Sequence, residues 1–94
     1  MPFSFDPAKS AANRAKHGID FVDAQALWED PDRLERAARS ETERRTQVIG
    51  MIDGKVWSAI VTHREEDTIR IVSVRRARRH EQALYHGGSA GRPA

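Results

Sequence analysis

The chain has 94 residues, contains no cysteine and carries a formal net charge of +2. A chain of this length forms one small domain that buries only about 60–65% of its unfolded surface. The absence of cysteine excludes disulfides, thiolate nucleophiles and cysteine zinc sites. It also predicts a reducing, cytoplasmic location. No signal peptide or long apolar run is visible, so neither secretion nor membrane spanning is predicted.

The first third of the chain predicts two helices. Asp6 and Pro7 are typical of an N-cap and the first helical position, and Gly18 ends this helix. Asp20 caps a second helix, which ends before Pro31 because a residue that precedes proline disfavours the α conformation. The apolar residues of the second helix fall at helical spacing on one face: Phe21, Ala24, Leu27 and Trp28.

The central part of the chain predicts strands. Asp53-Gly54 is a hairpin turn signal between two β-like runs, and a charged segment before them is an edge-strand candidate. The expected strands are residues 33–39, 46–52, 55–63 and 68–74. Regular alternation places two sets of side chains on common faces: Trp57, Ala59 and Val61 in one strand, and Ile69, Ile71, Ser73 and Arg75 in the next.

The last part of the chain predicts a helix that ends near Tyr85, and residues 87–94 have the composition of a disordered tail. The fold class is therefore α+β: two N-terminal helices, an antiparallel sheet of three to four strands and a C-terminal helix. Residues 1–86 are expected to form the single domain.

Positive charge is concentrated in the last third of the chain. Residues 1–60 have nine Lys and Arg against ten Asp and Glu, whereas residues 61–94 have seven against four. Thirteen of the sixteen basic residues are arginine, whose planar guanidinium binds phosphate in a bidentate manner and stacks on bases. This composition favours nucleic acid as a partner, although a high genomic GC content would also enrich arginine.

Four arginines crowd the transition from the last strand to the last helix: Arg75, Arg76, Arg78 and Arg79. A helix N-terminus already carries partial positive charge and unpaired N–H groups. Additional guanidinium groups there cost folding stability unless an anion binds, so the cluster predicts a phosphate site.

Two blocks of residues resemble the BrnT toxin family, and the resemblance spans residues 3–85. The first block is Asn13-x-x-Lys16-His17-Gly18-Ile19-x-Phe21, followed by Ala24 and Trp28-x-Asp30-Pro31. The second block is Arg44, Gly50, Thr62-x-Arg64, Arg70-Ile-Val-Ser73-x-Arg75-x-Ala77, Glu81 and Tyr85.

The resemblance implies a RelE/ParE-like fold and a type II toxin that arrests growth by cleaving RNA. It also implies a cognate antitoxin of the BrnA type, which carries a ribbon-helix-helix DNA-binding domain. DNA would then be contacted only through the toxin–antitoxin complex.

RNA cleavage without a metal ion requires a proton acceptor for the ribose 2′-OH, cations for the phosphorane and an acid for the leaving 5′-oxygen. Arg64, Arg70, Arg75 and Arg76 can supply the charge as one clamp if their strands pair across the short intervening turn. In this interpretation Arg64 and Arg75 are catalytic, Arg70 and Arg76 bind RNA, and the flanking charges bind or steer it: Arg78 and Arg79.

Three further candidates have structural alternatives. Histidine is the side chain best suited to exchange protons near neutral pH, so His17 is the candidate general base or acid, but a cation just before the end of a helix also has a capping role. Lys16 can stabilise charge or simply be a solvated helix end. Tyr85 can contact RNA or close the last helix against the core.

Other chemistries are disfavoured. The histidines lack zinc-ligand spacing and no glycine-rich phosphate loop is present, so neither a metal nor a cofactor is predicted. An alternative from another class is a non-catalytic module that binds nucleic acid or protein through the same basic surface. That module would bind RNA with a steep salt dependence and leave the strand intact.

Overall fold

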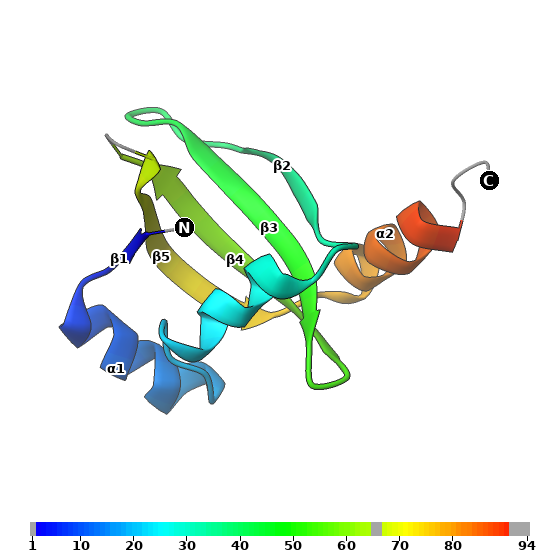
Figure 1. The fold of residues 1–94 in the computed structure, drawn as a ribbon, viewed down its shortest axis with the longest axis horizontal. Coiled ribbons are helices and arrows are strands. Elements are labelled where there is room, and N and C mark those ends of the chain that lie inside the picture. The colour runs from blue at the N-terminus through cyan, green and yellow to red at the C-terminus, as the bar shows by residue number, and fades with distance from the viewer. Residues whose placement is uncertain (1, 65–66, 91–94) are drawn as a thin grey trace.

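The computed structural model describes residues 2–64 and 67–90 and has five strands and three helices within these ranges (Figure 1). In chain order the elements are β1 (Phe3–Ser4), α1 (Pro7–His17), the 3-10 helix η1 (Asp23–Glu29), β2 (Leu34–Ala38), β3 (Arg45–Ile52), β4 (Lys55–His63), β5 (Ile69–Arg76) and α2 (Arg79–Ala90).

The sheet has the strand order β1-β5-β4-β3-β2, and its inner pairs are antiparallel. The α+β class is confirmed, but the predicted sheet of three to four antiparallel strands is corrected to a mixed sheet of five. The additional strand is β1, in which Phe3 and Ser4 pair in parallel with Ile69 and Arg70. A two-residue strand carries no periodicity, so only its distant partner defines it.

The first N-terminal helix begins and ends at its predicted signals, whereas the second begins later than predicted, at Asp23, with Val22 rather than Asp20 as its N-cap. The Asp6 side chain accepts a hydrogen bond from Ala8 N, and Gly18 closes α1 with a φ of 79°. Asp20 caps the following turn by accepting from Asp23 N at 2.8 Å. The segment after it is a 3-10 helix rather than the expected α-helix, and it ends at Asp30.

The hairpin between β3 and β4 follows the turn signal. Asp53 and Gly54 both have positive φ, 48° and 79°, as a type I′ turn requires. This turn sets the register in which Ile52 pairs with Lys55 and Arg45 pairs with Thr62.

A bulge in β5 changes which side chains share a face. Consecutive residues 60 and 61 of β4 pair with Ser73 and Ile71, so Val72 is an extra residue in β5. An extra residue reverses the alternation of side chains. The predicted common face is therefore wrong: Ile69 and Ile71 lie on one side of the sheet, whereas Ser73 and Arg75 lie on the other.

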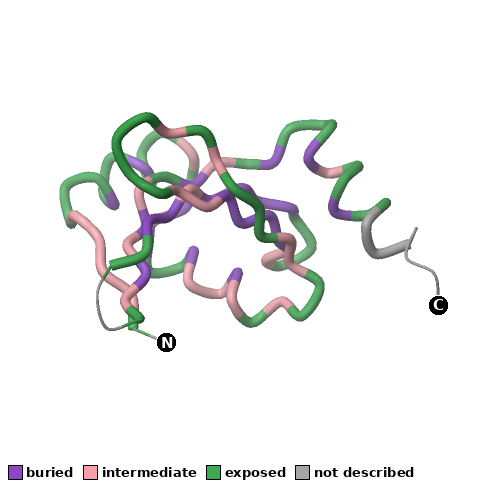
Figure 2. Tube along the Cα trace, turned by 90° about the horizontal axis from the view of Figure 1, so that it is seen from above, coloured by how far each residue is buried: buried purple, intermediate pink, exposed green. Residues whose placement is uncertain are grey.

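One face of the sheet, here called the covered face, packs against α1 and η1 (Figure 2). Its core includes the predicted Trp57, Ala59 and Val61, together with Leu27 of η1. The opposite side is here called the open face. Only one end of it is closed, where the start of α2 forms a smaller core. The members of that core are Ile49, Val56, Ala77 and Tyr85.

The C-terminal helix is longer than predicted, because α2 runs past Tyr85 to Ala90. The expected disordered tail is corrected for residues 87–90, which are helical. Residues 91–94, the rest of that tail, lie outside the described residues. No helix in the described part of the chain is long and apolar enough to cross a membrane.

The loop after η1 is tied to α2 across the edge of β3. Asp30 Oδ2 accepts hydrogen bonds from Tyr85 Oη at 2.7 Å and from Met51 N at 2.8 Å. This close approach requires glycine at position 50, because a Cβ there would lie 3.0 Å from Leu27 Cδ2 and 3.3 Å from Asp30 Oδ2.

Gly50→Ala is therefore expected to lower the free energy of unfolding by about 1–3 kcal/mol, since the added methyl overpacks the loop against β3. Chemical denaturation measures this change. Gly87→Ala is the matched control, because a Cβ at Gly87 meets nothing within 4 Å. Equal stability of the two variants would contradict the proposed packing constraint.

Candidate active site on the open face of the sheet

The centre of the open face carries a connected group of polar side chains around Glu81. Arg75 Nη1 and Nη2 donate to the Glu81 carboxylate at 2.7 and 2.9 Å, in a bidentate ion pair. The Glu81 side chain is only 4% exposed, whereas that of Arg75 is 30% exposed. The buried carboxylate of Glu81 therefore holds one side of the Arg75 guanidinium, and part of that guanidinium remains exposed to solvent.

The same carboxylate closes the N-terminus of α2. Glu81 Oε1 accepts a hydrogen bond from Arg78 N at 2.8 Å, which is the arrangement of a capping box. The arginine cluster in the sequence predicts phosphate at this helix N-terminus. In the structure a side chain of the protein fills the position at Arg78, and the exposed side chains of Arg78 and Arg79 flank it.

Gln47 extends the group across the sheet to β2. Its Nε2 donates to Glu81 Oε2 at 2.7 Å and to Ser58 Oγ at 2.8 Å, and its Oε1 accepts from Arg36 Nε at 2.7 Å. Arg36 and Arg75 are thus joined through two buried polar side chains. Sequence reasoning did not identify Arg36, Gln47 or Ser58 as site residues. The available signal was Gln47 itself, a polar residue directly before the apolar pair Val48-Ile49 in a predicted strand.

These contacts define the protonation state of the group. The hydrogen bond from Arg75 is the main cause that lowers the pKa of Glu81 to about 2, with further bonds from Arg78 N and Gln47. The same pairing raises the pKa of Arg75. At neutral pH the pair is fully ionised, so Glu81 is too weak a base to accept a proton from a ribose hydroxyl. Its two contacts with Arg75 fix the orientation of that guanidinium.

The predicted clamp of four arginines is divided by the register of the sheet. Arg75 lies opposite Ser58, Arg70 lies opposite Thr62, and Arg64 follows the end of β4, with its N–H bonded to Thr68 O at 2.7 Å. Because strands rise about 3.3 Å per residue, Arg64 and Arg75 are separated by about 20 Å along the sheet. Arg70 lies between them on the same face.

Arg76 lies on the opposite side of the sheet from Arg75. Its guanidinium carbon is 5.5 Å from the centroid of the Trp57 ring, and its Nε donates to Val56 O at 3.4 Å. This cation–π contact belongs to the covered face.

Lys16 and His17 end α1, which also packs on the covered face. Asn13 holds the helix there, because its amide bonds to Ile19 O at 2.8 Å and to Val74 N at 3.2 Å. Within residues 2–64 and 67–90, neither Lys16 nor His17 makes a hydrogen bond or an ion pair with the polar group around Glu81.

Tyr85 lies in the core rather than at the polar group. Its side chain is buried, and burial followed by the hydrogen bond to Asp30 raises its pKa to about 12. The structure favours the packing alternative for this residue.

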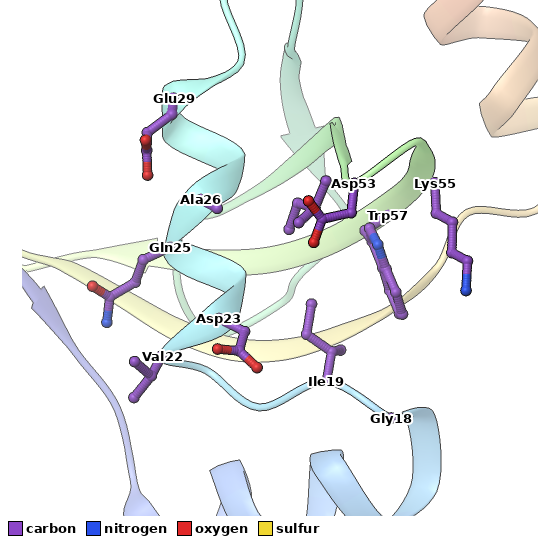
Figure 3. Close-up of a pocket in the computed structure, with 11 residues that line it drawn as sticks. Gly18, Ile19, Val22, Asp23, Gln25, Ala26, Glu29, Asp53, Lys55 and Trp57 are labelled. Atoms are coloured by element: carbon purple, nitrogen blue, oxygen red, sulfur yellow. The ribbon is translucent and has the colours of Figure 1, made fainter.

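A groove lies between η1 and the β3–β4 hairpin, beside Trp57 (Figure 3). Its lining carries three carboxylates, from Asp23, Glu29 and Asp53, and one ammonium group, from Lys55. This charge balance disfavours an anionic ligand in the groove. Among residues 2–64 and 67–90, no cluster of three or more His, Asp or Glu could hold a metal ion.

Comparisons with known proteins address the family and the fold of the chain. A family model described as the ribonuclease toxin BrnT of type II toxin–antitoxin systems matches residues 5–81. The chain is similar to the crystal structure of the Brucella abortus ribonuclease toxin BrnT, with a TM-score of 0.63 and 23% sequence identity. That alignment covers 84% of this chain and 99% of the other, and at this identity it supports the fold alone. Curated proteins provide no match.

The pH dependence of stability tests the Glu81 group. Because the folded pKa of Glu81, about 2, lies below its ordinary value of 4.5, its contribution is present above pH 4.5 and is lost as pH falls toward 2. In the wild type, protonation of Glu81 is expected to lower the free energy of unfolding by about 3 kcal/mol over this window, and the Glu81→Gln variant is expected to lack this decrease. Denaturation curves at several pH values measure it.

Glu41→Gln is the control, since Glu41 is exposed and lies outside the polar group. It is expected to keep the acid sensitivity of the wild type. If the free energies of unfolding of Glu81→Gln and of the wild type changed with pH in parallel, the Glu81 carboxylate would not be held as described.

Proposed function

The chain belongs to the BrnT family of ribonuclease toxins of type II toxin–antitoxin systems, and from this premise we propose that it cleaves RNA on the open face around Arg75. The observation that carries the proposal is the bidentate Arg75–Glu81 ion pair. It fixes one guanidinium at a partly exposed position on a rigid sheet, which is the preorganisation that transition-state stabilisation requires.

In the proposed reaction the ribose 2′-oxygen gives its proton to water and attacks the adjacent phosphorus, and the bond to the 5′-oxygen breaks as that oxygen takes up a proton from water. The products are a 2′,3′-cyclic phosphate and a free 5′-hydroxyl. Arg75 stabilises the negative charge that develops on the non-bridging oxygens, and Arg36 adds a second cation at the other end of the Gln47–Glu81 connection. No metal ion is required in this scheme.

The remaining arginines of the open face are proposed to hold the rest of the RNA strand. Arg70 and Arg64 continue the positive surface along β4 and β5, away from Arg75. Phosphate contacts of this kind position a strand without reading its bases. Arg78 and Arg79, at the start of α2, are proposed to steer RNA toward the site.

The comparison of two adjacent arginines tests this assignment. Arg75→Ala is expected to lower kcat for RNA cleavage, measured in the presence of a chelator, by about 10²–10³-fold, as for removal of one preorganised donor to a transition state. Arg76→Ala changes the same charge on the covered face and is expected to keep wild-type kcat. The assay follows fragments of a labelled single-stranded RNA.

Circular dichroism verifies that both variants are folded. A folded Arg75→Ala protein with wild-type activity would exclude the open face as the active site. His17→Ala belongs in the same series, and we expect it to remain active because α1 packs on the covered face.

A type II toxin implies a cognate antitoxin, and we propose that it is of the BrnA type, with a ribbon-helix-helix DNA-binding domain. An acidic or helical segment of this partner laid over Arg36, Arg70 and Arg75 would block the RNA surface. It would also reduce the repulsion among these guanidinium groups.

Binding of this partner is expected to raise the melting temperature of the toxin, because a ligand of the folded state stabilises it by mass action. A thermal shift assay with the purified antitoxin measures the change. The combined Arg36→Ala and Arg70→Ala variant is expected to show a smaller shift than the wild type. An unchanged shift would place the interface on another surface.

A further inference from the structure

Three side chains form a row across the open face, beyond the Arg75 site. Thr62 in β4 pairs directly with Arg45 in β3 and with Arg70 in β5. Directly opposed residues of antiparallel strands have Cβ atoms about 4.5–5.5 Å apart and point to the same side. A hydroxyl therefore lies between two guanidinium-bearing side chains.

The hydroxyl of Thr62 is exceptional among the buried polar groups of the described chain. Thr62 is 3% exposed, and its Oγ1 has no hydrogen-bond partner within residues 2–64 and 67–90. The other buried polar side chains each have one: Ser10, Asn13, Gln47, Ser58 and Glu81. A buried hydroxyl without a partner costs stability, so its retention calls for an explanation.

The charges on either side indicate the class of ligand. Arg45 pairs with Glu43 at 3.0 Å, but both side chains are 35% exposed, and such surface pairs contribute little. Arg70 makes no ion pair in the described ranges. Two guanidinium forks and one hydroxyl are donors that match the oxygens of a phosphodiester.

We propose that Arg45, Thr62 and Arg70 form a second phosphate subsite, which holds a phosphodiester of the RNA away from the cleaved bond. This proposal rests on the function proposed above. Thr62 is four residues along β4 from Ser58, which faces Arg75, so the two sites are about 13 Å apart. Rotation of the two long arginine side chains opens the hydroxyl to the bound strand.

The subsite requires a substrate long enough to occupy both positions. Thr62→Val removes the hydroxyl with little change of shape, and it is expected to raise KM for a long single-stranded RNA about 10-fold while kcat stays unchanged. Thr62→Ser keeps the hydroxyl and is expected to restore KM. A dinucleotide with one phosphodiester occupies only the Arg75 site, so all three proteins should cleave it equally.

Binding to a 2′-deoxy oligonucleotide of the same sequence tests the subsite without cleavage. Because each neutralised phosphate releases counterions, Arg45→Ala and Arg70→Ala are each expected to reduce the slope of log affinity against log salt by about 1. Arg76→Ala, on the covered face, is the control and should keep the wild-type slope. The melting temperature of Thr62→Val should equal or exceed that of the wild type, because the variant loses an unpartnered buried hydroxyl.

The outcomes separate this proposal from the function on which it rests. The subsite would be overturned if Thr62→Val, Arg45→Ala and Arg70→Ala kept the wild-type KM and salt slope while Arg75→Ala was inactive. The assignment of the active site would then still hold. Absence of RNA cleavage by the wild type would overturn the proposed function. The salt slopes would then still decide whether the row binds phosphate. A lower melting temperature for Thr62→Val would assign the hydroxyl a structural role.

Discussion

The buried carboxylate of Glu81 is the contact on which the arrangement of the open face depends. It binds the guanidinium of Arg75 in β5, the amide of Gln47 in β3 and the backbone N–H of Arg78 at the start of α2. A carboxylate at this depth is tolerated only because several donors replace its water. The same donors therefore dock the helix on the sheet and orient the guanidinium that we assign to catalysis.

The sheet divides stability and function between its two faces. The covered face contains the main apolar core, and the Trp57–Arg76 contact lies at its edge. The open face keeps polar and cationic side chains because α2 closes only one end of it. The bulge at Val72 determines this division for β5, since it reverses the alternation and so places Arg75 on the open face and Arg76 on the covered one.

Much of the fold could be predicted because its signals are local. The Asp6 cap, the left-handed Gly18 and the positive φ values of Asp53 and Gly54 depend on a few neighbouring residues. The site was less accessible to the same reasoning. Arg75 was identified from its charge and its place at the strand end, whereas Gln47 acquires its role only through contacts with strands and a helix distant in sequence.

Local signals were enough to predict the α+β class, both ends of the first helix and the hairpin turn, and the sequence carries the BrnT resemblance that the family comparison confirmed. Only the pairing of distant strands shows that Arg64 and Arg75 are far apart and that Thr62 lies between Arg45 and Arg70 in neighbouring strands. Local conformation follows from steric and capping preferences within a few residues. Strand register and side-chain pairing follow from packing between distant segments, which no short window of sequence contains.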